Sequence, residues 1–298
     1  MKRAWIGAAL LLCLLLSACG TQSVPATQEQ WVDQVQGEMG AYVPERWTYR
    51  LSCETVNEQY CYAENQRLMV DASYALPRMT VYHQDGRPYD EESEVMLPAM
   101  QAAQKFNQYF DEWLALQKTN FSELATAAVT DYTKNASDVW QQPDYHYTDK
   151  VAATFWNNDH IACVTLWANS FTGGAHEIST RSCVTFDMHT GTVITINDMV
   201  DDYAALRDAV ALDILGQIQD GKWVKYYDGA TLFDDYEETI PEWMTRSIFF
   251  GDGKMTVVFS AYDIAPYSAG EQAFEVSYAL IEPYLNDYGR RMLEIDKK

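Results

Sequence analysis

Cysteines are the residues of this chain whose type and spacing most directly suggest chemistry. Four of the six cysteines, Cys53, Cys61, Cys163 and Cys183, lie beyond the N-terminal segment. An even number in an exported chain suggests two disulfides, with three connectivities open. The local pairing joins Cys53 to Cys61 and Cys163 to Cys183. Metal binding by four cysteines is the alternative, but no CxxC spacing occurs, so we expect neither a metal nor another cofactor.

A β-hairpin is predicted between Cys163 and Cys183. Two apolar, β-rich runs flank Gly173 and Gly174, which supply positive φ at little cost and let the chain turn back. If the turn is centred on Gly173, the two cysteines lie directly opposite each other, where a cross-strand disulfide is sterically feasible. We expect the loop that it would brace to be functional. The loop presents Phe171, Thr172 and His176.

The five histidines are scattered along the chain and do not form an obvious catalytic motif. His176, followed by Glu177, could supply half of a metal or acid–base site, but no second histidine lies near it in the sequence. Signatures of zinc proteases, serine hydrolases and nucleotide-binding loops are absent. We therefore expect no catalytic residues. The alternative is a cell-wall-modifying hydrolase that uses His176 and a nearby carboxylate.

The first twenty residues predict an exported lipoprotein. Lys2 and Arg3 precede an apolar run, residues 5–16, which is too short for a bilayer that needs about 20 residues. The run ends in LSACG, which resembles a bacterial lipobox, so we expect Cys19 to carry a lipid anchor. An ordinary signal peptide with an incidental cysteine is the alternative. The expected location is the extracytoplasmic face of the cell membrane.

The net charge of the chain restricts the classes of partner that it is expected to bind. Without Lys2 and Arg3, 19 basic against 43 acidic side chains leave a formal charge of −24. Such a chain is repelled by nucleic acid and by anionic lipid, so we expect no nucleic-acid binding and membrane contact only through the anchor. A cationic partner would be attracted. Taken alone, the charge is explained more simply by solubility and colloidal repulsion.

Hydrophobic periodicity predicts strands and helices in the first half of the chain. Three strands are predicted near the N-terminus, at 47–51, 68–74 and 80–82. Cys53 and Cys61 would clamp one connection between these strands. A helix is predicted over 91–117, with Pro98 tolerated in its first turn, and a second helix over 122–134.

The second half predicts an antiparallel meander over 145–196, followed by a helix that Asp201 or Asp202 would cap and Gly221 would end. The buried face of this helix would carry Leu206, Val210, Ile214 and Ile218. A hairpin over 248–259 and a last strand near 274–276 follow. The predicted fold class is α+β, with antiparallel sheets and packed helices in two intimately packed subdomains.

Two stretches of the chain resemble a known family. The first runs from Phe171 to His176 (FTGGAH) and continues at 186–191 (FDMHTG), and the second runs from Tyr262 to Gly270 (YDIAPYSAG). In this order they are similar to the extracytoplasmic domain of the lysozyme-sensing anti-sigma-V factor (RsiV-like) family. That domain also accompanies the catalytic domain of some peptidoglycan deacetylases and occurs in lone lipoproteins.

Together with the N-terminal signal, the resemblance divides the chain into four segments. The segments are a lipoprotein signal peptide (1–18), the lipidated Cys19 with a tether (19–44), an N-terminal α+β companion domain (45–140) and a C-terminal RsiV-like α+β domain (141–298). After processing we expect no cytosolic segment, so an anti-sigma role is not carried over. The metal-binding motif of the deacetylases is absent from the sequence, so deacetylation is not carried over either.

The resemblance implies a non-catalytic binding domain, in one case a receptor for lysozyme. Two loops would form the contact surface. The residues carried over are Phe171, Gly173, Gly174 and His176 in the first loop, and Tyr262, Pro266 and Tyr267 in the second. We therefore expect an envelope lipoprotein that binds a cationic protein such as lysozyme, or peptidoglycan.

Overall fold

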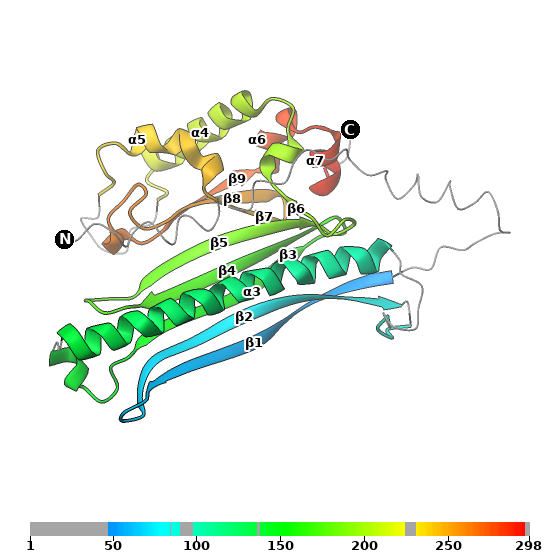
Figure 1. The fold of residues 1–298 in the computed structure, drawn as a ribbon. Coiled ribbons are helices and arrows are strands. Elements are labelled where there is room, and N and C mark those ends of the chain that lie inside the picture. The colour runs from blue at the N-terminus through cyan, green and yellow to red at the C-terminus, as the bar shows by residue number, and fades with distance from the viewer. Residues whose placement is uncertain (1–46, 84, 90–97, 136–137, 224–230, 296–298) are drawn as a thin grey trace. The chain divides into compact units, whose positions relative to one another are not determined.

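The computed structural model describes residues 47–83, 85–89, 98–135, 138–223 and 231–295 (Figure 1). The described residues form a six-stranded sheet in the order β1-β2-β3-β4-β5-β6 and an antiparallel three-stranded sheet in the order β7-β8-β9. The strands of the larger sheet are β1 (Trp47–Tyr62), β2 (Arg67–His83), β3 (Tyr147–Asn157), β4 (Ile161–Phe171), β5 (Ile178–Asp187) and β6 (Val193–Ile194). The predicted α+β class is confirmed.

The predicted lipoprotein signal, Cys19 and the tether lie outside the described residues. No helix in the described part of the chain is long and apolar enough to cross a membrane. The larger sheet takes β1 and β2 from before residue 140 and its other strands from after it. The predicted boundary between 45–140 and 141–298 stays a prediction.

β1 and β2 form one long antiparallel hairpin, which differs from the predicted three short strands. The polar residues between 52 and 59 do not break β1, because an edge strand can keep polar side chains in solvent. Cys53 and Cys61 therefore lie on the same strand, roughly 26 Å apart at about 3.3 Å per residue. A disulfide requires Cα atoms within about 7 Å of each other. The predicted Cys53–Cys61 clamp is wrong.

The long helix α3 (Pro98–Thr130) replaces the two predicted helices. Pro98 is its first residue, as expected for a residue without an N–H to donate. Residues 118–121 contain neither glycine nor proline, so nothing in the sequence interrupts the helix there. The first part of the predicted helix, residues 91–97, lies outside the described residues. Figure 1 shows α3 running along β2.

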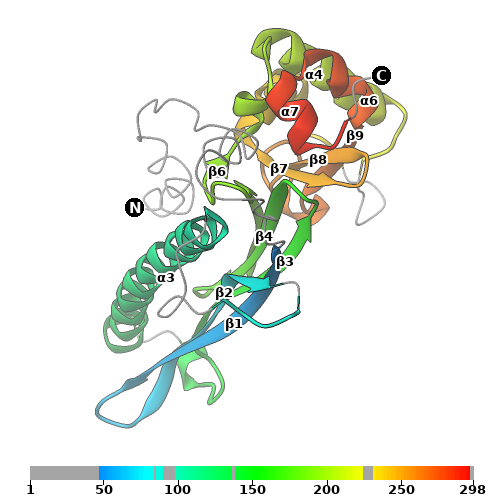
Figure 2. The ribbon, with the colours of Figure 1, turned by 90° about the vertical axis from the view of Figure 1, so that its right-hand side faces the viewer.

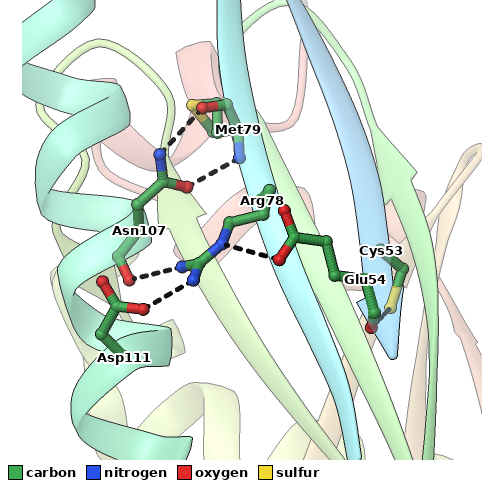
Figure 3. A network of polar contacts seen from close by, with 6 residues as sticks. All are labelled: Cys53, Glu54, Arg78, Met79, Asn107 and Asp111. Carbon is green, nitrogen blue, oxygen red and sulfur yellow. Dashed lines mark hydrogen bonds and ion pairs between the residues drawn. The ribbon is translucent and has the colours of Figure 1, made fainter. Parts of the chain in front are cut away.

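α3 also closes a free edge of β2. β3 pairs with β2 only over Val70–Tyr74, in parallel, and residues 87–89 fold back along residues 81–83, so among the described residues the edge around Met79 has no strand beside it. There the side-chain amide of Asn107 accepts from the Met79 N–H (2.8 Å) and donates to the Met79 carbonyl (3.0 Å), as Figure 3 shows. Arg78 donates to the Asn107 carbonyl and pairs with Asp111 at 2.7 Å. The Asn107 side chain thus makes the two hydrogen bonds to the Met79 backbone that a neighbouring strand would otherwise make.

β4 contributes side chains to the two largest hydrophobic cores of the described residues, because its first four residues, Ile161 to Val164, are apolar and buried on both faces. Ala162, Val164 and Leu166 pack in the core that contains α3. Ile161 and Cys163 pack in the core that contains the smaller sheet. In the α3 core, the rings of Phe106 and Phe110 pack against the ring of Phe186 on β5.

The second core joins the smaller sheet to the C-terminal helices, and here the predictions are confirmed. The strands are β7 (Ser247–Gly251), β8 (Lys254–Phe259) and β9 (Gln272–Ser277), and the helices are α4 (Tyr203–Gln219), α5 (Tyr236–Thr239), α6 (Tyr278–Ile281) and α7 (Asp287–Met292). Asp202 caps α4 by accepting from the Ala205 N–H. The predicted apolar face of α4 is buried, and Gly221 follows its end with φ +73°. Figure 2 shows α4 and α6 beside this sheet.

Candidate functional site

The β4–β5 hairpin carries the first predicted loop at its tip. Gly173 and Gly174 have φ of +94° and +101°, the left-handed conformations that their sequence predicted. A Cβ at Gly173 would lie 2.9 Å from the Tyr145 hydroxyl, so this glycine also permits a close contact. Phe171 meets the Tyr145 ring edge-on, with centroids 5.7 Å apart. One side of the tip is therefore built against Tyr145.

The cysteines at the base of this hairpin are not directly opposite each other, contrary to the prediction. Cys163 pairs with Thr185, and Cys183 pairs with Thr165, because the hairpin is centred on Gly174. A shift of one residue in the turn centre moves each pairing by two residues.

All four described cysteines are free thiols, so the predicted Cys163–Cys183 disulfide is not confirmed. The two thiols are still diagonal neighbours, and Cys183 donates a hydrogen bond to the Cys163 sulfur. This bond lowers the pKa of Cys163 and, together with burial, raises the pKa of Cys183.

The second predicted loop follows β8 and is held by Asp263. Its carboxylate accepts from the Ser260 N–H at 2.7 Å and pairs with Arg246 at 3.1 Å. Burial raises the pKa of Asp263, opposed by the charge of Arg246. Tyr262 lies in the left-handed region with φ +74°, although its side chain is 63% exposed. Left-handed backbone is costly for a large residue, and such strain concentrates at functional sites.

The two loops meet, although about 90 residues separate them in the sequence. The His176 and Tyr267 rings stack with centroids 3.8 Å apart and an interplanar angle of 12°. The Tyr267 hydroxyl donates to the carbonyl oxygen of Glu177. Tyr262 lies beside Tyr267, with ring centroids 5.8 Å apart. We call the area formed by His176, Glu177, Ile178, Tyr262 and Tyr267 the two-loop surface.

A half-buried ion pair fixes the hairpin to the chain that follows the second loop. Arg181 on β5 pairs with Glu271 at 2.7 Å. The guanidinium also lies 4.8 Å from the ring centroids of both Trp167 and Phe249, so it is stacked as well as paired. Burial raises the pKa of Glu271 despite this partner. The ion pair thus ties β5 to the segment between the second loop and β9.

An open groove of about 530 Å³ lies on the other side of the hairpin tip. Its lining residues are Gln142, Pro143, Asp144, Tyr145, His146, Thr148, Phe171 and Glu177. Glu177 belongs to both the groove and the two-loop surface. With Asp144 it gives the groove two carboxylates, which would favour a cationic group.

His176 contacts a backbone carbonyl and an aromatic ring. Its Nδ1 lies 3.0 Å from the carbonyl oxygen of Glu177, and its ring is stacked on Tyr267. Among the described residues no carboxylate is hydrogen-bonded to it. Nor do the described His, Cys, Asp and Glu side chains form any group of three that could hold a metal ion.

The structure gathers three of the seven predicted contact residues on one surface: Tyr262, Tyr267 and His176. Phe171 and Gly173 face Tyr145 instead, a Cβ at Gly174 would meet nothing within 4 Å, and Pro266 begins the turn Tyr267–Ala269. The sequence reasoning missed Tyr145, Arg181 and Glu271. Only their residue types, an aromatic and two opposite charges near the loops, signalled a role.

Comparison with known proteins gives a family for part of the chain. Residues 220–279 match a family model described as "Protein of unknown function (DUF3298)". These residues include β7–β9 and the second loop. A comparison with curated proteins finds no match.

Two solved structures of DUF3298 proteins match this chain. A member from Bacteroides fragilis is 13% identical with a TM-score of 0.55, and the alignment covers 85% of this chain and 100% of that one. A protein from Pseudomonas aeruginosa is 19% identical with a TM-score of 0.42, over 82% of this chain and 96% of that one. The first likeness supports the fold alone. The narrower resemblance to RsiV-like proteins and deacetylase accessory domains stays a prediction.

Proposed function

We propose that this protein is a non-catalytic binding domain of the cell envelope, tethered to the membrane through Cys19, whose two-loop surface binds a protein or glycan ligand. A lysozyme-like muramidase is the sharpest version of this ligand. The observation that carries the proposal is the His176–Tyr267 stack, because it joins the two loops on one exposed face. If the two loops had been buried far from each other, their residues would have been assigned a structural role only.

The composition of the two-loop surface supports a binding role. Tyr262 and Ile178 are 63% and 59% exposed, although large apolar groups are normally buried. Tyrosine buries area at low entropic cost and is enriched among the residues that dominate interfaces. The turn that carries the exposed Tyr262 is closed by a hydrogen bond from the Tyr262 N–H to the Ala265 carbonyl (3.0 Å), so less ordering is needed on binding.

Electrostatics favour a cationic ligand for this surface. Glu177 belongs to the two-loop surface, Asp144 lines the groove on the other side of the hairpin tip, and the chain as a whole is strongly acidic. Long-range attraction of this kind raises the association rate more than the affinity and weakens with salt. A basic muramidase fits this description, and a peptidoglycan fragment could instead stack its sugars on the rings.

The test measures retention of the full chain on immobilised lysozyme at increasing salt. We expect the wild type to be retained at low ionic strength. For Tyr262→Ser we expect a dissociation constant at least tenfold larger, which corresponds to a loss of about 1.4 kcal/mol in binding free energy. Tyr203→Ser is the matched control, because Tyr203 is also exposed (43%) but lies at the start of α4. A cationic protein without muramidase activity tests whether charge alone suffices.

Three outcomes would contradict the proposal in different ways. No retention of the wild type at low salt would exclude lysozyme, and sedimentation with peptidoglycan would then test the glycan version. Equal losses for Tyr262→Ser and Tyr203→Ser would exclude the two-loop surface. Turnover of peptidoglycan fragments that is abolished by His176→Ala in a folded protein would replace binding with hydrolysis.

A further inference from the structure

β1 is an unpaired edge of the larger sheet within the described chain. It occupies the first place in the strand order and pairs only with β2. Its sixteen residues contain neither proline nor lysine, two of the residues with which proteins commonly protect an exposed edge. The unused N–H and carbonyl groups of such a strand are a template for another strand.

The two faces of β1 differ in chemistry. Glu54 and Glu58 lie on the face toward α3: Arg78 of β2 is 3.9 Å from Glu54, and Lys118 of α3 is 2.9 Å from Glu58. Figure 3 shows Glu54 directed at Arg78. Cys53 and Cys61 have the opposite parity in the strand, so they belong to the other face, and both are exposed. The two carboxylates therefore meet their cationic partners on one face of β1, and the two thiols lie on the other face.

The thiols are placed symmetrically on β1. Cys53 lies four residues before Asn57, and Cys61 lies four residues after it. Suppose that the β1 strands of two copies pair in antiparallel fashion about a two-fold axis at Asn57. Each residue of one copy then faces the residue of the second copy that lies equally far on the other side of Asn57. Cys53 then faces Cys61 of the second copy, and the reverse contact follows by symmetry.

We propose that β1 is a pairing surface for a second copy of this chain, in antiparallel register centred on Asn57, with two Cys53–Cys61 disulfides between the copies. Residues directly opposite in antiparallel strands have Cα atoms about 4.5–5.5 Å apart, within the range that a disulfide spans. The same strand cannot form this bond within one copy, as its geometry showed.

The charges of β1 are compatible with this register. Glu54 would face Tyr60 of the second copy, and Glu58 would face Val56 of the second copy, so no two carboxylates are directly opposed. Registers displaced by two residues would separate the thiols by one pleat and lose both bonds. Among the registers that the backbone alone would allow, only this one joins all four thiols, whereas a register centred on Cys53 or on Cys61 would join a single pair.

The covalent step requires an oxidant, for which a small-molecule disulfide suffices. Each new bond forms from two thiols, which lose two electrons and two protons. The oxidant disulfide takes up both and leaves as two thiols, through a mixed disulfide on one of the cysteines. A dimer of this kind belongs in an oxidising compartment, and it does not depend on the proposed ligand.

The test uses the full chain in mild detergent with oxidised glutathione, followed by non-reducing electrophoresis. We expect the wild type to run at twice its mass until reductant is added. Cys53→Ser and Cys61→Ser should each lose the covalent dimer, because each remaining thiol would face a serine. A mixture of the two variants, carrying different tags, should regain a cross-linked heterodimer with one disulfide.

The outcomes separate this register from unspecific oxidation. Cross-linked homodimers in either single variant would overturn it, as would a mixture that forms no heterodimer. Cys53→Ser/Cys61→Ser is the control for the remaining cysteines, and a covalent dimer in this double variant would also contradict the proposal. Circular dichroism checks that each variant is folded, which serine at an exposed strand position should permit.

Discussion

The two ends of the β4–β5 hairpin are built on different principles. At the base, Ile161 and Phe186 are fully buried and face opposite cores. At the tip, Gly174 and His176 are exposed, and the shape depends on one ring stack and a few hydrogen bonds. The base is fixed by burial and so governs stability. The tip is fixed by specific contacts that cost little to change, which is the property expected of a recognition surface.

The largest expected difference between the two ends concerns glycines with positive φ. Gly191, in the turn after β5, has φ +68°, and a Cβ there would lie 2.0 Å from the Ala102 carbonyl oxygen of α3. Gly191→Ala should cost more than about 4 kcal/mol, because backbone must move. Gly174→Ala at the tip meets nothing within 4 Å and should cost about 1–2 kcal/mol for its φ alone.

Urea unfolding of both variants checks this comparison. A loss for Gly174→Ala as large as that for Gly191→Ala would show that the tip is as tightly packed as the base. The contrast drawn between the two ends would then be wrong.

A smaller effect is expected from the stack at the tip. A double-mutant cycle of His176→Ala and Tyr267→Ala should give a coupling energy of about 0.5–1.5 kcal/mol, typical of aromatic pairs. Neither single change should approach the cost of a core substitution. A coupling energy near zero, measured from thermal or urea unfolding, would mean that the two loops are positioned independently.

The smallest expected effect is a pH dependence at the base. His160 Nδ1 lies 3.0 Å from His189 Nε2, and burial followed by the charge of His189 lowers the pKa of His160, as does Arg291. Glu294 and Asp159 act in the opposite direction. The unfolded state therefore binds the proton more readily, and stability should decrease as pH falls from about 6.5 through the lowered pKa.

His160→Gln provides the comparison for this pH dependence. Its free energy of unfolding should fall less than that of the wild type between pH 7.5 and 5, since it has no proton to gain. Equal slopes for the two proteins would assign the pH dependence to other groups.

The parts of the fold that depend on local pattern could be predicted from the sequence. The cap of α4 at Asp202, its buried face and the glycine after its end all carry strong local signals. The hairpin turn at Gly173 and Gly174 was visible for the same reason. Its centre was not, and an error of one residue there misplaced Cys163 and Cys183.

Features that depend on contacts between distant segments of the chain could not be predicted from local sequence patterns. Nothing local distinguishes a polar stretch of an exposed edge strand from a loop, which is why Cys53 and Cys61 were assigned to a connection. The two loops of the candidate site could be named from their residues. Their contact could not be derived, because the stack of His176 on Tyr267 depends on how β5 meets the smaller sheet.

The Asn107 amide has a mechanical consequence for the whole β1–β2 arm. Met79 is almost fully buried, so its N–H and carbonyl have no water to turn to if Asn107 moves away. Sliding α3 by one helical turn, about 5.4 Å, would leave both groups unpaired at about 1–3 kcal/mol each. The helix and the hairpin should therefore move as one rigid body. A pull on β1 would be transmitted to α3 without slippage.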